Sequence, residues 1–263
     1  MQRSCVQPIG RGANVQMSRM TQSLRLAAPP ASVYSSPMSR RQLRFAVLLG
    51  SLVMVALATC LFSGCHSAHG ESVSSRPLIV LDAGHGGRDP GAVCNGVHEA
   101  DINLAMLKSV FELLAADERL AVRATRTLDI YITLADRIAV ANDAEAALYL
   151  SIQSNACEYP DVTGIETLVS DTLSESAPSW QFAEILQDAV TNATGARDRG
   201  VRAQDLYLHR AAMPAALIEV GFLTNDEERT KLLDPAYHQT IARAIYGGIV
   251  AYLNYADPSF AER

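Results

Sequence analysis

The stretch LIVLDAGHGG, residues 78–87, joins an apolar run to a glycine-rich turn that contains a histidine. Four consecutive apolar residues, 78–81, predict a strand buried on both faces, because a half-exposed strand would alternate apolar and polar side chains. Strands of this kind are typical of parallel sheets covered by helices. The turn would then place His85 at the carboxyl end of a strand, where ligands bind in open α/β sheets.

After residue 77, further apolar runs alternate with segments of helical periodicity, without internal repeats. This pattern predicts an α/β fold, a single three-layer domain with helices on both faces of a mostly parallel, six-stranded twisted sheet. The expected strands are 78–81, 120–125, 146–152, 164–169, 206–208 and 215–220, and the expected helices are 101–116, 133–142, 176–194, a short one from 225, and 235–253.

The chain of 263 residues carries a net charge of −6, which is divided unevenly along its length. Residues 1–64 contain seven arginines and no lysine, aspartate or glutamate, so they carry +7 and residues 65–263 carry the remaining −13. An acidic folded part argues against a nucleic-acid partner, because binding to phosphates requires a basic surface.

The N-terminal part has the order of an export signal. A basic cluster ending at Arg44 precedes an apolar run, residues 45–62, and then Ser63 and Gly64 lead directly to Cys65. This order predicts a signal peptide of the bacterial lipoprotein type, cleaved before Cys65, which would then be lipidated. An uncleaved membrane anchor and an ordinary signal peptide are the alternatives, since eighteen apolar residues are just long enough to span a bilayer. All three alternatives predict that the domain is exported. As a lipoprotein, the domain would be anchored to a membrane and would face the periplasm or cell wall.

These features give the expected boundaries along the chain. Residues 1–37 are a segment without folding signals or an over-extended gene start, 38–64 the signal peptide, 65–76 a polar tether, 77–255 the folded domain and 256–263 a tail.

Four residues carry chemistry that this fold would place at one edge of its sheet. His85 in the first turn and Glu99 at the start of a helix form a nitrogen–oxygen pair suited to zinc, whose catalytic sites keep three protein ligands and a water. Gln153 follows the third expected strand. Glu219 lies within an apolar strand, and burial there would raise its pKa toward the range of a general base.

Three of these residues also have a purely structural alternative. His85 can be a solvated histidine in a tight turn or part of a phosphate-binding nest. Glu99 can serve the helix dipole as a carboxylate in the first turn. Glu219 can be the partner of Arg199 or Arg210 in a buried ion pair.

Several segments together resemble the zinc-dependent N-acetylmuramoyl-L-alanine amidases of the type called amidase family 3. They occur in the family's order over nearly all of residues 77–254, and they are IVLDAGHGGRDPGAV, HEADINL, TRTLD, TLADRIAVAN, LYLSIQSNA, TGIETLVS, DRGVR and MPAALIEVGFLTNDEE. The resemblance implies hydrolysis of the amide bond between N-acetylmuramic acid and L-alanine of the stem peptide in bacterial peptidoglycan. It also implies zinc at His85, Glu99 and Gln153, with Glu219 as the catalytic base.

Gln153 departs from the family, which has a histidine at this position, and an amide oxygen is a weaker zinc ligand than imidazole. Gln153 can ligate weakly in a metal-poor enzyme, or His98, His209 or Cys157 can take its place. The domain can also be a catalytically impaired lipoprotein that binds peptidoglycan or regulates another hydrolase, and a different metal or reaction is the remaining alternative. Cys94 and Cys157 flank the two halves of the expected site, so a disulfide between them is a further alternative.

Overall fold

The structure is a computed structural model that describes residues 76–263. The expected signal peptide at 38–64, the lipidated Cys65, the segment 1–37 and nearly all of the tether therefore lie outside the described residues. Within residues 76–263, no helix is both long enough and apolar enough to cross a membrane.

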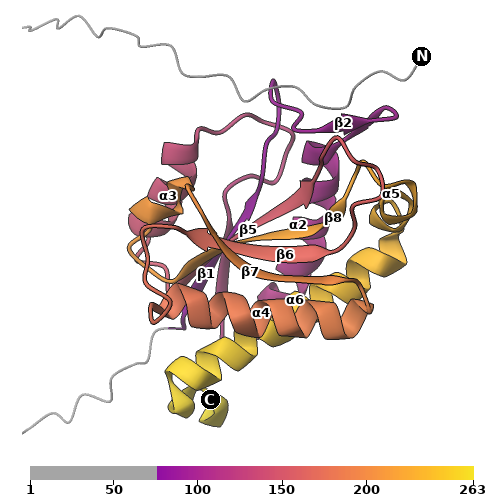
Figure 1. The fold of residues 1–263 in the computed structure, drawn as a ribbon. Coiled ribbons are helices and arrows are strands. Elements are labelled where there is room, and N and C mark those ends of the chain that lie inside the picture. Colours follow the sequence, from indigo (N-terminus) through magenta and orange to yellow (C-terminus); the bar gives the residue numbers. More distant parts are fainter. Residues whose placement is uncertain (1–75) are drawn as a thin grey trace, which may run out of the picture. The chain divides into compact units, whose positions relative to one another are not determined.

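Six strands form the central sheet of the domain. They are β1 (Leu78–Ala83), β4 (Ala121–Ala124), β5 (Leu148–Asn155), β6 (Ile165–Ser170), β7 (Asp198–Gln204) and β8 (Ala215–Phe222). Their order across the sheet is β4-β1-β5-β8-β6-β7 (Figure 1). The first four strands in this order are parallel, whereas β6 and β7 are parallel to each other and antiparallel to β8. The prediction of a mostly parallel, six-stranded sheet is confirmed.

Helices connect most of these strands. They are α2 (Glu99–Ala115), α3 (Leu134–Asn142), α4 (Pro178–Thr194), α5 (Asp226–Leu232), α6 (Pro235–Ala256) and the 3-10 helices η1 (Tyr207–Arg210) and η2 (Pro258–Glu262). A short hairpin of β2 (Val93–Cys94) and β3 (Val97–His98) precedes α2. Side-chain caps set several of the helix starts. For example, Thr133 accepts a hydrogen bond from the Asp136 N–H, and Asn225 accepts two from the first turn of α5.

One expected strand is wrong. Residues 206–208 lead into η1, and the strand beside β6 is β7 instead. The sequence of β7, DRGVRAQ, has no apolar pattern because this strand lies at the edge of the sheet and is largely exposed. Leu208 is apolar because it packs in a small cluster against the sheet. A second correction concerns Gln153, which lies inside β5 and not after the end of a strand.

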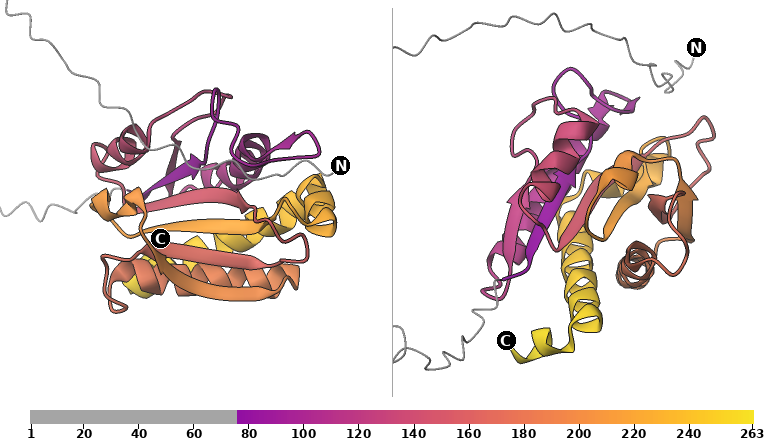
Figure 2. Two further views of the ribbon diagram at one scale, coloured as in Figure 1. Left: turned by 45° about the horizontal axis from the view of Figure 1, so that its top comes forward. Right: turned by 90° about the vertical axis from the view of Figure 1, so that its left-hand side faces the viewer.

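Helices cover both faces of the sheet, but unequally. The main core lies between one face and α2, α4 and α6, and it contains Ile79, Leu150 and Ile218. In Figure 2 the yellow α6 ends in η2 at the C-terminus. On the other face, α3 and η1 enclose a smaller apolar cluster around Val80 and Tyr149. The second face is therefore less thickly covered, and the polar residues of the candidate site lie on it.

The residues expected as a C-terminal tail pack onto the domain. Phe260 in η2 is 1% exposed and belongs to the main core. The Arg119 guanidinium lies 4.9 Å from the centre of its ring and donates to Asp117, with Nη2 2.7 Å from Oδ2. The Tyr246 hydroxyl donates to the same carboxylate oxygen at 2.9 Å. These contacts join α6 and η2 to the turn before β4.

We expect Asp117→Asn to destabilise the domain at neutral pH, and the difference from the wild type to shrink in acid. Hydrogen bonds from Arg119 hold the pKa of Asp117 at about 2, below its ordinary value of 3.8. A lowered carboxyl pKa contributes stability above the unfolded-state value, and that stability is lost as the pH falls toward 2. Urea unfolding at about pH 7 and about pH 2.5 measures the effect.

The neighbouring exposed carboxylate provides the control, because Glu118→Gln should change stability little at either pH. If Asp117→Asn and the wild type differed in free energy of unfolding by the same amount at both pH values, the ionised carboxylate of Asp117 would not be what stabilises these contacts.

Candidate active site

The second face of the sheet changes from apolar to polar along its strands. Alternate residues of a strand share a face, so Val80 on β1 is followed there by Asp82. On β5, Tyr149 is likewise followed by Ser151 and Gln153. Val80 and Tyr149 belong to the apolar cluster under α3 and η1, whereas the polar residues come later, toward the carboxyl ends of the parallel strands. The sheet thus presents its polar side chains where α/β folds bind ligands.

A buried ion pair lies at the base of this polar region. Arg137 Nη1 is 2.8 Å from Asp82 Oδ1, and the two side chains are only 4% and 3% exposed. The same guanidinium donates to the backbone carbonyl oxygens of Ala83 and His85, at 2.6 and 2.7 Å. The Ser151 hydroxyl donates to the other oxygen of Asp82 at 2.8 Å. The ion pair therefore fixes the turn that follows β1.

A second buried arginine holds the same turn. Arg126 donates to the carbonyl oxygens of Ala83 and Gly84, both at 2.9 Å, and to that of Ala100 in α2 at 2.8 Å. Burial lowers the pKa of Arg126, and the charge of Arg137 lowers it further. The sequence analysis missed both arginines, because an arginine after a strand or within a helix gives no sign that it is buried.

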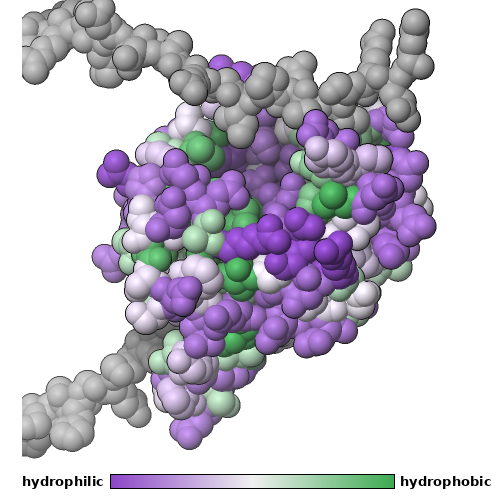
Figure 3. All heavy atoms as spheres, in the orientation of Figure 1, coloured by the Kyte–Doolittle hydropathy of each residue, from purple (hydrophilic) through white to green (hydrophobic). Residues whose placement is uncertain are grey.

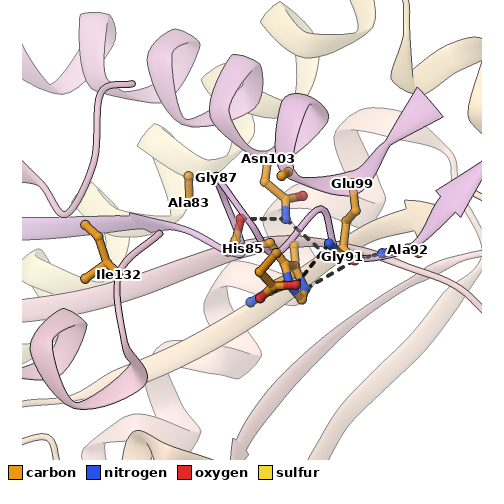
Figure 4. Close-up of polar contacts among 12 residues, drawn as sticks. Ala83, His85, Gly87, Gly91, Ala92, Glu99, Asn103 and Ile132 are labelled. Carbon is orange, nitrogen blue, oxygen red and sulfur yellow. Dashed lines mark hydrogen bonds and ion pairs between the residues drawn. The ribbon is translucent and has the colours of Figure 1, made fainter. Parts of the chain in front are cut away.

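His85 is held in a rare backbone conformation between two carboxylates. Its φ angle is 60°, a region that residues other than glycine seldom adopt and that is frequent at functional sites. The ring Nδ1 is 2.9 Å from Asp89 Oδ2, and Nε2 is 3.3 Å from Glu99 Oε2. Figure 4 shows His85 and Glu99 pointing toward one another. Burial alone would lower the pKa of His85, but hydrogen bonds and charges from Glu99 and Asp89 together raise it to about 9.

Glu99 is 6% exposed, and groups from three elements fix its orientation. Its Oε1 accepts hydrogen bonds from Asn103 Nδ2 at 3.1 Å and from the Ser154 N–H of β5 at 3.3 Å. Its Oε2 accepts one from the Ala92 N–H at 3.0 Å. The carboxylate therefore does not bind the backbone N–H groups of the first turn of α2. It is held by other side-chain and backbone groups, and it faces His85. Asp89, four residues after His85, is a site residue that the sequence analysis missed.

Gln153 lies directly above the turn. A Cβ atom on Gly84 would overlap the Gln153 amide, so a larger residue at that position would require the Gln153 side chain to move. The Gln153 Nε2 donates to Ser151 Oγ over a long 3.4 Å. In the sheet, Gln153 is the register partner of Glu219 on β8. The structure therefore places the expected third ligand position between the turn that carries His85 and the expected catalytic base.

The carboxyl group of Glu219 is buried without a partner for one of its oxygens within residues 76–263. Its Oε2 is buried and has no hydrogen-bond partner among the described residues. Burial, followed by the negative charges of Glu99 and Glu166, raises its pKa well above the ordinary value of 4.5. The expected alternative of an ion pair with Arg199 is wrong, because Arg199 binds Glu166 with an Nε–Oε2 distance of 2.8 Å. The Arg210 alternative finds no support either, since no ion pair of residues 76–263 includes Glu219.

The residues considered as substitutes for Gln153 have other contacts. His98 Nδ1 is 3.8 Å from Asp101 Oδ2, and His209 Nδ1 is 2.9 Å from the Leu206 carbonyl oxygen. Cys157 is a free thiol whose Sγ donates to the Tyr159 carbonyl oxygen at 3.2 Å, so the alternative of a disulfide with Cys94 is not formed. Within residues 76–263, no group of three His, Cys, Asp or Glu side chains has the arrangement of a metal site.

Two donors nevertheless fit zinc. His85 Nε2 and Glu99 Oε2, 3.3 Å apart, are ligand types that this ion takes. Asp89 holds the other ring nitrogen of His85, as a carboxylate usually does behind a zinc-bound histidine. Ionisation of the Glu219 carboxyl beside them is disfavoured by burial and by the charges of Glu99 and Glu166, and a cation there would favour the ionised form. Gln153 offers the third position only an amide.

Comparison with known proteins identifies the family. Residues 79–251 match the family model Amidase_3, described as N-acetylmuramoyl-L-alanine amidase. The chain is 38% identical over 181 residues to the endolysin of Bacillus phage SPP1, which covers 67% of this chain and 66% of that protein. It is 37% identical over 175 residues to the N-acetylmuramoyl-L-alanine amidase LytC of Bacillus subtilis, which covers 66% of this chain but 35% of that protein.

A solved structure agrees with the sequence comparison. The crystal structure of the N-acetylmuramoyl-L-alanine amidase from Clostridium difficile 630 matches with a TM-score of 0.66 and 33% identity, over 69% of this chain and 98% of that chain. The family model covers well over half of the chain, and the fold agrees. The chain therefore belongs to the Amidase_3 family of N-acetylmuramoyl-L-alanine amidases, which are peptidoglycan hydrolases.

Proposed function

We propose that this chain hydrolyses the amide bond between N-acetylmuramic acid and L-alanine of the stem peptide, with zinc held by His85, Glu99 and Gln153. The observation that carries the proposal is the 3.3 Å approach of His85 Nε2 to Glu99 Oε2, near the unpaired carboxyl of Glu219. Membership of a zinc-dependent family supports the same activity.

Zinc, when bound, supplies a Lewis acid that activates water and polarises the amide carbonyl. Glu219 accepts the proton of the attacking water and delivers it to the leaving amine of L-alanine. A carboxyl group is suited to both steps when its pKa is raised, because it then binds a proton more readily than an ordinary carboxylate and can still release it. Asp89 orients the His85 ring, and Arg137 holds the backbone from which that ring projects.

Gln153 sets the limit of this site. A neutral amide oxygen binds zinc more weakly than imidazole, so only His85 and Glu99 are strong ligands. The protein then works as a metal-poor enzyme whose activity depends on the zinc concentration.

A second candidate function follows from the same residue. The Gln153 amide nitrogen donates to Ser151, and the third position offers zinc only the amide oxygen, a weak ligand. If zinc is not retained there, the domain binds peptidoglycan or regulates another hydrolase without cleaving the amide bond.

The proposed location follows from the N-terminal sequence. Residues 38–64 have the order of a signal peptide, and Cys65 is placed for lipidation. We propose an exported, membrane-anchored lipoprotein that faces the periplasm or cell wall. Peptidoglycan lies on that side of the membrane, so this location brings the enzyme to its substrate.

Removal of the catalytic base tests the activity. We expect the purified protein with added zinc to release stem peptides from peptidoglycan, and Glu219→Gln to lower the rate by at least about 100-fold, because an amide cannot take up the proton. Chromatography of the soluble peptides measures release. Asp101→Asn is the control, since that carboxylate is 67% exposed and contacts His98 at the outer side of α2. Wild-type release by Glu219→Gln would contradict the mechanism.

The same substitution should increase stability in the metal-free protein. Glu219→Gln removes a buried acid whose ionisation is disfavoured by burial and by the charges of Glu99 and Glu166, so we expect a higher free energy of unfolding in chelator at about pH 7. Glu166 is the register partner of Glu219 on β6, and Glu166→Gln is the matched control. It should destabilise because Asn155 and Arg199 both donate to that carboxylate. Urea unfolding of both variants measures the contrast. If Glu219→Gln instead lowered the free energy of unfolding, the Glu219 carboxylate would have a stabilising partner in solution.

Replacement of Gln153 by histidine tests whether this residue is the third zinc ligand and limits the affinity for zinc. We expect Gln153→His to tighten zinc binding by at least about tenfold and to raise activity at low zinc, because imidazole is the stronger ligand. Competition with a fluorescent chelator measures the affinity. Unchanged affinity in Gln153→His would place the third ligand elsewhere.

A further inference from the structure

The substrate of the proposed reaction has two chemically different halves. On one side of the scissile amide is an uncharged sugar, and on the other is a peptide that carries at least one carboxylate. A positive charge on the peptide side of the site would favour one direction of binding.

A row of side chains crosses the polar face of the sheet from the metal position to its edge. Gln153 on β5 is the register partner of Glu219 on β8, which is in turn the register partner of Glu166 on β6. Register partners share a face, so the three side chains lie side by side. The row continues to β7 through Arg199, whose Nε is 2.8 Å from Glu166 Oε2.

A bulge in β7 brings a second arginine to the same row. The register between β6 and β7 shifts after Ile165, and Gly200 within the shift has a φ angle of 79°, which favours glycine. Arg199 and Arg202 are three positions apart and would lie on opposite faces of a regular strand. With the additional residue, both reach the carboxylate of Glu166, and Arg202 Nη1 lies 3.7 Å from its Oε2.

The two arginines have different roles in this arrangement. Glu166 already accepts a hydrogen bond on each oxygen, from Asn155 at 2.9 Å and from Arg199 at 2.8 Å. Arg199 is 17% exposed and also packs over the Phe222 ring at 4.9 Å. The Arg202 side chain is 53% exposed beside the row, and its Nε donates to the Arg199 carbonyl oxygen at 3.3 Å. In Figure 3, strongly hydrophilic residues gather near the centre of the view, where Figure 1 draws β7.

The other side of His85 has a different surface. The loop after β4 carries Ile130 and Tyr131, which are 47% and 40% exposed, and it is tied to the turn by a hydrogen bond from the Gly87 N–H to Asp129. An apolar and aromatic rim suits an uncharged sugar ring. Arg88 also lies there, with its guanidinium 4.1 Å from the centre of the Tyr131 ring, and it is the rival candidate for the carboxylate.

We infer that Arg202 binds a carboxylate of the stem peptide, so that the peptide half of the substrate lies over β6 and β7 and the sugar half lies toward the loop after β4. A guanidinium is suited to this role because it forms paired, charge-assisted hydrogen bonds with a carboxylate. The inference rests on the proposed function and adds the direction of substrate binding to it.

The test compares two substrates that differ only in charge. One is N-acetylmuramoyl-L-alanyl-D-glutamate with both carboxyls free, and the other is the same molecule with both converted to primary amides. We expect Arg202→Gln to raise KM for the charged substrate by about tenfold, the loss of one charge-assisted hydrogen bond, with kcat and the diamide kinetics nearly unchanged. Arg202→Lys should retain part of the preference, and Arg88→Gln should leave it intact. Thermal unfolding of each variant verifies that the fold is kept.

Two results would overturn the inference. An equal effect of Arg202→Gln on both substrates would mean that Arg202 is only a structural partner of Glu166. If Arg88→Gln instead removed the preference for the charged substrate over the diamide, the peptide half would bind on the side of Arg88. Calorimetric binding of both molecules to Glu219→Gln, with and without Arg202→Gln, gives the same answer without turnover. If the wild type cleaves neither substrate, the proposed function fails. If it cleaves both equally well, only the inference about Arg202 fails.

Discussion

The buried ion pair between Arg137 and Asp82 is the contact on which the site depends. Two charges leave water in this pair, and such a pair is favourable only when further hydrogen bonds use the remaining donors and acceptors. Here the guanidinium also binds two carbonyl oxygens of the turn, and Ser151 and Thr125 donate to the carboxylate. Removal of one partner would leave the other charge buried, at a cost of about 3–5 kcal/mol. The backbone of His85 can therefore stay in the left-handed region.

The two faces of the sheet have different roles, because one carries most of the packing that stabilises the domain and the other carries the residues of the candidate site. On its main-core face, mostly apolar side chains pack against three helices. On the other face, the apolar residues end halfway along β1 and β5, and polar residues take their place. The fold can therefore tolerate an uncompensated carboxyl at Glu219, because the packing that stabilises the domain lies on the opposite side. This arrangement is typical of sites in which poorly satisfied polar groups serve function.

Much of the fold followed from the sequence because buried strands and amphipathic helices have distinct periodicities. His85, Gln153 and Glu219 were predicted near one another since each follows, or lies near, the carboxyl end of a strand. Glu99 was expected beside His85 because the two lie on neighbouring loops. Asp89 was missed, because a carboxylate in a polar loop gives no sign that it faces a histidine. The partner of Arg199 was also misassigned, since a choice between Glu166 and Glu219 depends on strand register. The edge strand β7 was missed because exposed strands lack an apolar pattern.

The bulge at Gly200 has a consequence for the behaviour of the protein in concentrated solution. β7 is the last strand of the sheet, so its outer backbone groups are available to a strand of another chain. A bulge bends such a strand, and charged side chains on it repel a second copy, so the domain is protected against edge-to-edge aggregation. The bulge that brings Arg202 to Glu166 thus also helps to keep the chains apart.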